Sequence, residues 1–338
     1  MADALAKAPD RGITEGERAH VAELRADSMP ASTRRQYRRA FKRFAEWCQG
    51  KGLAFLPAEP LTMAGYLAYA EKEGLAIATI LVEAAAINKA HVMSGLDSPR
   101  YHAEVREVLR GIALRQAGRK TGEKAAVSIA LLERFVATLP YSLTGDRDKA
   151  LLLVGWAAAL RRSEIVNLDY EDVQWTDDGA VLRIRRSKTD QLGKGAFVAI
   201  HTTDRLELCP VRALRSWLER ARISTGPVFR VVRSNRNGER ALSRRLNSEY
   251  PRVIVKQSCE RVGINGDRFG AHSLRAGFIT AAAEAGKPIH EIQLTTRHKD
   301  VNTLLGYIRP TEAMQRGAGK GLLDRRPPKP PAPAADAH

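Results

Sequence analysis

The sequence predicts a mainly α-helical protein of two domains: an N-terminal bundle of four or five helices, then an α+β domain with a small antiparallel sheet. Two observations indicate this fold class. Residues 31–118 carry apolar side chains at helical spacing and show no strand-type alternation. Beyond residue 127, two short strand-like runs lie between further helical segments. A chain of 338 residues is long enough to bury two ordinary cores.

Changes in composition divide the chain further. Residues 13–29 are expected either to fray or to form a helix that docks on a neighbouring protomer. The stretch around Gly122 is basic and lacks apolar periodicity, as expected of a linker, and the C-terminus is rich in Pro and Ala, which favours disorder. The expected segments are an N-terminal tail or short helix (1–29), the bundle (30–118), a basic linker (119–126), the second domain (127–325) and a disordered Pro-rich tail (326–338).

The first helix of the bundle has the clearest pattern. Its apolar residues recur at spacings of four, three and four: Tyr37, Phe41, Phe44 and Cys48. This spacing puts them on one helical face. Ser32 or Thr33 is expected to cap the helix at its start. Three more helices are expected after Pro60, from about residue 76 to 94, and from about residue 99 to 116.

The other face of this first helix is basic, and it carries six cationic residues: Arg34, Arg35, Arg38, Arg39, Lys42 and Arg43. Such a face is either a solvated surface or a set of phosphate contacts. The net charge of the chain is +17, and it is positive in both main blocks but negative in residues 1–30. We therefore interpret the basic face, together with Arg119 and Lys120 of the linker, as a DNA-binding surface.

The second domain is expected to contain helices interrupted by one pair of strands. Strands are expected at residues 181–185 and 196–200, around a glycine-containing loop. The expected helices span about 127–139, 146–160, 210–222, 247–263, 271–285, 288–296 and 300–308.

Several classes of protein are disfavoured. No apolar run approaches the roughly 18 residues of a membrane span, and the N-terminus lacks a signal-peptide core. The three cysteines are scattered without metal-ligand spacing. Neither a carboxylate cluster for two metals nor a glycine-rich phosphate loop is present, so neither a metal nor a cofactor is expected. We expect a cytoplasmic, nucleoid-associated protein that does not bind membranes.

Seven side chains suit chemistry on a phosphodiester, and in chain order they are Arg161, Glu164, Lys188, His272, Arg275, His298 and Tyr307. His272 and Arg275 are three residues apart and share a helical face. Arginine and protonated histidine neutralise charge in a phosphoryl transition state, and tyrosine can act as a covalent nucleophile. Each residue alone also has an ordinary explanation: the His-x-x-Arg pair as a helix surface, and Tyr307 as a core residue.

The order of these seven residue types resembles the catalytic signature of the tyrosine recombinases, the phage integrase family. The bundle resembles the core-binding domain of the Cre-like members, around Phe41–Gly52, Tyr66-Leu67 and Gly74–Ala76. The resemblance implies a core-binding bundle and a catalytic domain that clamp duplex DNA. Two positions depart from the family, which usually has glycine where Ala159 and Arg297 stand, and these departures leave the loop geometry open.

The resemblance also implies roles. Tyr307 is the expected nucleophile, and Arg161 and Arg275 are the expected clamp on the scissile phosphate. The Leu-Arg-x-Ser-Glu pattern favours Arg161 over its neighbour Arg162. Glu164 is expected to orient Arg161 or His272, or else to be only a local ion pair.

The remaining expected roles concern protons. Lys188 is the expected acid for the leaving 5′-oxygen, with Lys194 of the same loop as the alternative. His272 is the expected base or proton shuttle for Tyr307, and His298 is expected to donate a hydrogen bond to a phosphoryl oxygen.

The function so implied is site-specific DNA recombination through a 3′-phosphotyrosine intermediate and a Holliday junction. The expected partners are double-stranded DNA with an inverted-repeat recombination site and a homo-tetramer assembled on two such sites. Two alternatives stay open at this point: a type IB topoisomerase-like DNA relaxing enzyme, and a non-catalytic DNA-binding protein that retains the fold.

Overall fold

The structure is a computed structural model. It describes residues 14–118 except Ser28, 125–185, 195–298 except Asn237, and the single positions Asp300, Val301 and Leu304. The chain separates into two compact units, Met1–Thr121 and Gly122–His338, and each is treated by itself. Helices dominate both units and the strands form small antiparallel sheets, which confirms the predicted fold class.

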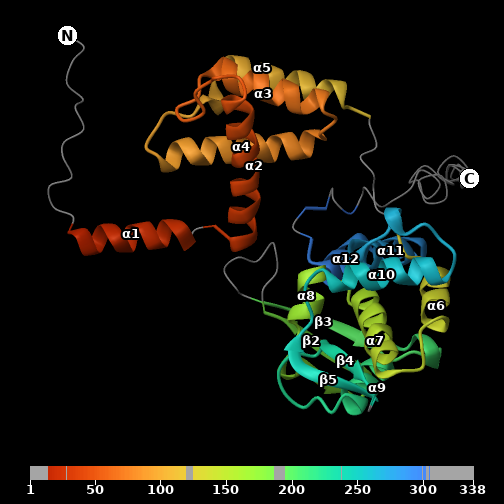
Figure 1. Ribbon diagram of the computed structural model, residues 1–338. Helices are drawn as coiled ribbons and strands as arrows, with labels where there is room; N and C mark the ends of the chain where they lie inside the picture. Colours follow the sequence, from red (N-terminus) through yellow and green to blue (C-terminus); the bar gives the residue numbers. More distant parts are fainter. Residues whose placement is uncertain are drawn as a thin grey trace, which may run out of the picture. The chain divides into compact units, whose positions relative to one another are not determined.

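The first unit is entirely helical over the residues described (Figure 1). Its elements are α1 (Glu15–Asp27), α2 (Ala31–Gln49), α3 (Pro60–Lys72), α4 (Ile77–Met93), η1 (Pro99–Tyr101) and α5 (Ala103–Arg115). Helix α2 packs against α4, and α3 packs against α5. Phe44 and Cys48 of α2 are fully buried in the core, as their helical spacing predicted. The side chains described in α1 are exposed, Leu24 by 57%.

The expected cap of α2 is wrong. The helix begins at Ala31, and the residue before it, Pro30, makes no side-chain cap hydrogen bond. Proline fixes φ near the value that a helix start needs, so the chain can turn into the helix one residue before Ser32 without a hydroxyl cap.

A buried carboxylate fixes part of the basic face of α2. Glu83 of α4 is fully buried. It accepts a hydrogen bond from Arg43 Nε at 2.9 Å, is also contacted by Arg43 Nη2, and accepts from the hydroxyl of Tyr66. Burial, followed by the hydrogen bond to Glu83, raises the pKa of Tyr66, so the phenol remains a donor. Arg43 therefore neutralises a carboxylate buried in the bundle. Arg35, Arg38 and Arg39 of the same face extend into solvent instead.

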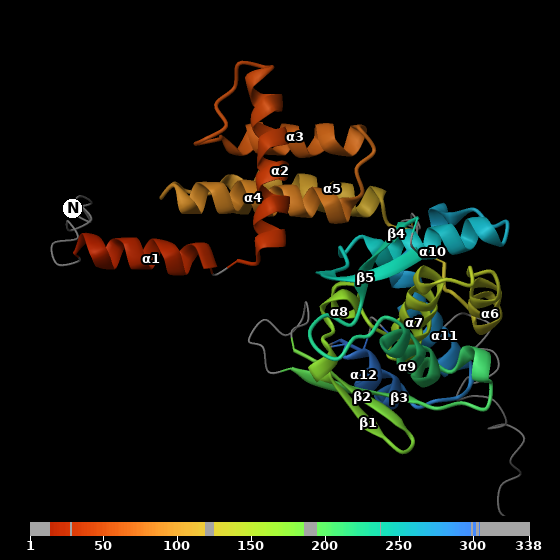
Figure 2. The ribbon, with the colours of Figure 1, turned by 60° about the horizontal axis from the view of Figure 1, so that its bottom comes forward.

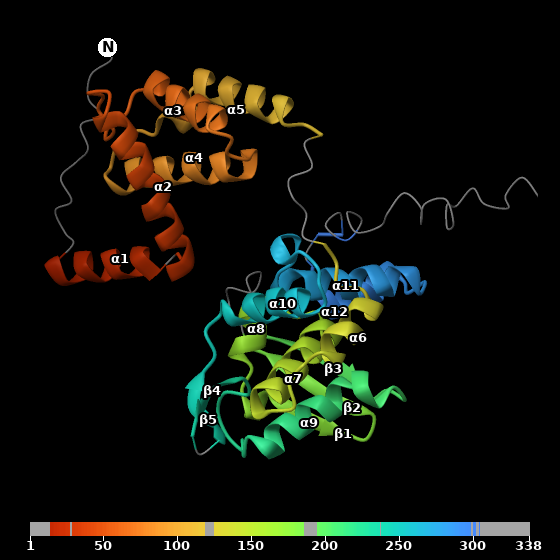
Figure 3. The same ribbon diagram turned by 45° about the vertical axis from the view of Figure 1, so that its right-hand side comes forward.

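The second unit is built around one buried helix, α7 (Leu143–Ala157), which packs against α9, α10 and α11. Figures 1 and 3 show α10, α11 and α12 gathered at one end of this unit and α9 at the other. Its other helices are α6 (Ile129–Ala137), α8 (Arg162–Asn167), η2 (Tyr170–Asp172), η3 (Leu206–Leu208), α9 (Pro210–Arg220), α10 (Tyr250–Arg261), η4 (Gly266–Arg268), α11 (Ala271–Glu284) and α12 (Ile289–Thr296).

Two antiparallel sheets flank these helices, where the sequence predicted one. The first has the order β1-β2-β3, with β1 at its edge (Figure 2), and the second pairs β4 with β5. The strands are β1 (Val173–Thr176), β2 (Gly179–Ile184), β3 (Ala196–His201), β4 (Arg230–Asn235) and β5 (Gly238–Arg245). Strands β2 and β3 are the predicted pair, with Leu182 opposite Val198 and both side chains in the core.

A close backbone contact sets the position of α11. A Cβ at Gly277 would lie 1.9 Å from the carbonyl oxygen of Val127, so no larger residue fits there without a shift. The same Val127 carbonyl accepts from Trp156 Nε1 at 2.9 Å, and the Val127 amide donates to the Ser273 carbonyl at 2.9 Å. These contacts fasten the first two turns of α11, which carry His272 and Arg275, to α7 and to the segment before α6.

None of the helices in the described part of the chain is long and apolar enough to cross a membrane. Cys48, Cys209 and Cys259 are buried and unbonded to one another.

Candidate active site

The first part of the site is the turn from α7 into α8. Ala159 adopts a left-handed backbone conformation, with φ of 48°. This places Arg161 just before α8, where Glu164 reaches back to it. The backbone amide of Arg161 donates to Glu164 Oε2 at 2.8 Å, and Arg161 Nη1 donates to Oε1 at 2.8 Å. The side chain of Glu164 is fully buried and that of Arg161 is 17% exposed, so the carboxylate holds the arginine at the edge of the core.

The second part is Arg275 on α11. The residue is fully buried, and its guanidinium binds backbone carbonyls from two distant segments. Nη1 donates to the oxygen of Ala159 at 2.6 Å, and Nη2 contacts the oxygen of Thr296. Nη2 also lies 3.2 Å from Nε2 of His298. Arg275 therefore joins the turn before Arg161 to the loop that carries His298.

The third part is the end of α12. Thr296 Oγ1 lies 2.7 Å from the Ile292 carbonyl, to which it can only donate, and 2.9 Å from His298 Nδ1. Because the hydroxyl hydrogen is already used, Oγ1 accepts from Nδ1–H. His298 is thereby assigned as the neutral tautomer protonated at Nδ1, with Nε2 left to accept from Arg275.

The electrostatics of the site follow from this geometry. Burial disfavours the charged form of Glu164, but Arg297, together with the hydrogen bonds from Arg161, outweighs burial and keeps the pKa of the carboxyl below its ordinary value. Burial, followed by the charges of Arg275 and Arg161, lowers the pKa of His298 to about 4. The charge of His272 also lowers this pKa, so both arginines and both predicted histidines act on one region.

The lowered pKa of His298 predicts a pH dependence of stability. In the unfolded chain this histidine takes up a proton near its ordinary pKa of about 6.5, whereas the folded protein does not do so until about pH 4. The free energy of unfolding should therefore be constant above pH 6.5 with respect to this group and should fall as the pH drops from 6.5 towards 4. Urea unfolding of the wild type and of His298→Gln between pH 7 and pH 4.5 measures the difference.

The variant should lose less stability over that interval than the wild type does. His290→Gln on the exposed side of α12 is the matched control, and it should retain the wild-type slope. Parallel pH profiles for the wild type and His298→Gln would contradict the assignment of a neutral His298.

The structure thus brings Arg161, Glu164, Arg275 and His298 together, and it leaves His272 exposed one helical turn before Arg275. Two predicted residues, Lys188 and Tyr307, lie outside the described residues, as do Lys194, Arg119, Lys120 and the C-terminal tail. Leu304 is 2% exposed and packs on α11 and α12 with Ile279, Ala283 and Ile292. Leu304, three positions before Tyr307, therefore fixes the chain to α11, which carries Arg275, and to α12, which precedes His298.

The six basic residues of α2 are all exposed. Lys42 pairs with Glu46 at 3.5 Å and Arg43 with the buried Glu83, while Arg35, Arg38 and Arg39 extend from the same helix into solvent.

Sequence reasoning missed two contributors. Arg297 appeared there only as a departure from the family pattern, whereas its Nη2 binds Glu164 Oε2 at 2.6 Å. Thr296 was not singled out, although its hydroxyl fixes the tautomer of His298. A hydroxyl two residues before a histidine was the available signal, but it is too common to stand out.

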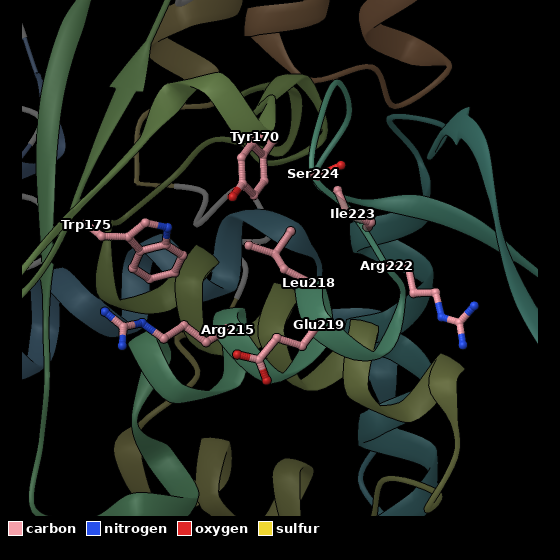
Figure 4. A pocket seen from close by; sticks show the side chains of 8 residues that line it. All are labelled: Tyr170, Trp175, Arg215, Leu218, Glu219, Arg222, Ile223 and Ser224. Carbon is pink, nitrogen blue, oxygen red and sulfur yellow. The ribbon is translucent and has the colours of Figure 1, made fainter.

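Apart from this site, an open cavity of about 610 Å³ lies beside α9 and β1 (Figure 4). Trp175 and Arg215 form one side of it and Arg222 and Ser224 the other, and Arg215 stacks 4.6 Å from the centre of the Trp175 ring. None of the proposed catalytic residues that the structure describes lines this cavity. Among the residues described, no group of three or more His, Cys, Asp or Glu side chains could hold a metal ion.

Comparison with known proteins gives consistent matches. The sequence pattern of the phage integrase family matches residues 130–314. An integrase/recombinase XerD homologue of Selenomonas ruminantium is 34% identical over 78% of this chain and 77% of its own length. Recombinase Cre of Escherichia phage P1 is 28% identical over 83% of this chain and 84% of its own. The crystal structure of the XerH site-specific recombinase bound to palindromic difH substrate superposes with a TM-score of 0.57, at 17% identity, over 79% of this chain and 73% of that one.

The arginine and histidine site and these relatives together show that the protein is a tyrosine recombinase. Enzymes of this class recombine DNA at specific sites by strand transesterification. The chain belongs to the phage integrase family. These relatives do not favour the topoisomerase or the non-catalytic DNA-binding protein.

Proposed function

We propose that the enzyme cleaves one DNA strand with Tyr307, which forms a 3′-phosphotyrosine bond and releases a 5′-hydroxyl. That hydroxyl attacks the phosphotyrosine of the partner duplex, and two such exchanges pass through a Holliday junction. The observation that carries the proposal is the chain of contacts that brings Arg161, Arg275 and His298 together. Arg161 is held by the buried Glu164, and Arg275 binds both the Ala159 carbonyl, two residues before Arg161, and His298. Two guanidinium cations beside a histidine suit an anionic transition state.

Arg161 and Arg275 would bind the non-bridging oxygens of the scissile phosphate. In the DNA-free protein, Nη2 of Arg275 faces the lone pair of His298 Nε2. A bound phosphate adds a negative charge beside both side chains, which raises the pKa of His298. Once protonated at Nε2, His298 can donate to a phosphoryl oxygen, and the arginine hydrogen is then released for the phosphate as well. DNA binding would therefore take up a proton at this residue.

The remaining roles concern proton transfer at the attacking oxygen of Tyr307 and at the leaving 5′-oxygen of the DNA. His272, exposed at the start of α11, would accept the proton of Tyr307. Lys188 would protonate the leaving 5′-oxygen, because an alkoxide is a poor leaving group. Glu164 touches Arg161 and Arg297 and would act by positioning them.

We propose an inverted-repeat recombination site as the DNA partner, with four protomers holding two such sites. The outer basic residues of α2, with Arg119 and Lys120 of the linker, would bind backbone phosphates. Phosphate contacts of this kind position the duplex without reading its sequence. We place the enzyme's action in the cytoplasm, at the nucleoid.

The phosphate contacts of α2 can be tested by salt dependence. Changing Arg35, Arg38 and Arg39 together to Ala should reduce the slope of log affinity against log salt by about 2 to 3, since each phosphate contact contributes roughly 0.9. Sequence preference should stay the same. Binding measured by fluorescence anisotropy on two unrelated duplexes, at four salt concentrations, gives both quantities.

Arg205→Ala, in the second unit, is the matched control, because Arg205 is similarly exposed but pairs with Glu133 at 2.6 Å. An unchanged slope in the triple variant would show that the face of α2 is only solvated.

The reaction itself is tested with a suicide substrate. A nick placed next to the scissile phosphate lets the short product strand diffuse away, so a covalent protein–DNA adduct accumulates. Sites selected from random DNA by binding to the protein supply the sequence of the substrate. A denaturation-resistant adduct joined to the 3′-phosphate supports the proposal, and its absence on every selected site would contradict it.

A further inference from the structure

We propose that Arg297 is a positioning residue for DNA cleavage, which holds the Glu164 carboxylate and so ties the loop of His298 to the turn of Arg161. This inference rests on the proposed function and adds a residue that the catalytic signature does not contain. In the family that the sequence resembles, this position is often glycine, so Arg297 supplies a side chain that glycine lacks.

The contacts of Arg297 connect two parts of the chain that are 133 positions apart. Nη2 lies 2.6 Å from Glu164 Oε2, and Nη1 donates to the carbonyl of Thr295 at 3.0 Å. The side chain of Arg297 is 10% exposed and that of Glu164 is fully buried. An ion pair this well shielded from water holds its geometry more firmly than a surface pair does.

Arg297 is the contact through which the Glu164 carboxylate reaches a distant segment of the chain. Its Oε1 binds Arg161 Nη1, and its Oε2 is shared between the Arg161 amide and Arg297. When the Arg297 guanidinium is removed, the carboxylate keeps, among the described residues, only partners from its own turn. Nothing on Glu164 would then fix the distance between the Arg161 turn and the end of α12.

Charge gives a second reason. Glu164 and Arg161 together are neutral, so without Arg297 they would add no net positive charge to that of Arg275. Arg297 brings the group of three back to a net charge of +1. The phosphoryl transition state carries more negative charge than the bound DNA does, so this restored charge favours the transition state over simple binding.

Arg297 occupies a backbone position that suits glycine better than other residues. Arg297 ends α12 with φ of 57°, a left-handed conformation that favours glycine. Replacing Arg297 by glycine therefore removes the side chain without straining the backbone. Arg222, just after α9, has the same kind of conformation, with φ of 51°, but its side chain is exposed. It lines the cavity beside α9, which none of the described catalytic residues lines. It provides a matched control.

The test compares Arg297→Gly, Arg297→Lys and Arg222→Gly. Both glycine variants relieve a left-handed backbone, so each should fold, as thermal unfolding can check. With enzyme in excess over a suicide substrate, Arg297→Gly should form the covalent adduct about 10- to 100-fold more slowly, the cost of misplacing catalytic groups by about 1 Å. Its affinity for uncleaved DNA should change far less. Arg297→Lys should recover most of the rate, and Arg222→Gly should match the wild type.

A double variant tests whether Arg297 acts through Glu164. In a Glu164→Gln background, adding Arg297→Gly should cost little further rate, because the carboxylate that it holds has gone. The inference is overturned if Arg297→Gly cleaves at the wild-type rate, or if its loss is the same in both backgrounds. A wild type that forms no adduct at all would instead overturn the proposed function. If Arg297→Gly folds poorly, Arg297→Gln, which removes the charge but keeps most of the side chain, takes its place in both backgrounds with the same expected outcomes.

Discussion

Tyr307→Phe is expected to bind DNA with wild-type affinity and to form no covalent adduct. The substitution removes one oxygen, and that oxygen is the proposed nucleophile; the aromatic ring remains to fill the same space. The arginines and His298 would still bind the phosphate, because they are held by contacts that do not involve this tyrosine. Denaturing gels of the suicide substrate measure the adduct, and gel shifts measure binding.

Tyr141→Phe is the matched control, since this tyrosine of the second unit is completely exposed. It should cleave as the wild type does. Adduct formation by the Tyr307 variant would place the nucleophile on another residue, and peptide mapping of the adduct would then identify it.

Lys188→Ala is expected to slow cleavage of ordinary DNA by about 10²- to 10⁴-fold, the usual contribution of a general acid. A substrate with sulfur at the bridging 5′-position should be cleaved by this variant at nearly the wild-type rate, because a thiolate leaves without being protonated. Single-turnover rates on the two substrates give the ratio. Comparable slowing on both would show that Lys188 serves binding or folding, and not proton transfer.

Lys194→Ala separates the two lysines of that loop. If Lys188 is the acid, the Lys194 variant should show no selective recovery on the sulfur substrate. Recovery confined to the Lys194 variant would transfer the role to Lys194.

Much of the fold was predictable because several helices either bury an apolar stripe, as α2 does, or carry a long apolar run, as α7 does. The spacing of Phe44 and Cys48 predicted their burial in α2, and the apolar run before Arg161 predicted α7. Strands β2 and β3 were also predicted, since each alternates between core and surface.

The remaining strands were missed for physical reasons. Strand β5 is rich in arginine and none of its side chains is fully buried, so it lacks the apolar alternation that marks a strand. An Asn-Gly pair at positions 237 and 238 was the available hairpin signal. Strand β1 has only four residues, and the Asp178-Gly179 pair that follows it was a similar signal.

For the site, sequence order indicated which residues act together but not how they are held. Nothing in the sequence predicts that Arg275 is buried against the carbonyls of Ala159 and Thr296, because a backbone contact depends on the fold and not on the residue type. The two departures from the family pattern, Ala159 and Arg297, keep the left-handed conformation for which glycine is the usual residue. A non-glycine residue at each position therefore leaves the turn in place, which the sequence had left open.

The distances along the chain between contacting site residues bear on when the enzyme becomes active during synthesis. Arg275 meets Ala159 across 116 positions, and Arg297 meets Glu164 across 133. Contacts so far apart in sequence close late in folding, because the intervening chain must first lose its conformational freedom. A nascent chain that has emerged only as far as α9 holds Arg161 and Glu164 but has no partner for them from α11 or α12. On the proposed mechanism, DNA cleavage would therefore require α11 and the residues after α12 to be folded against the turn of Arg161.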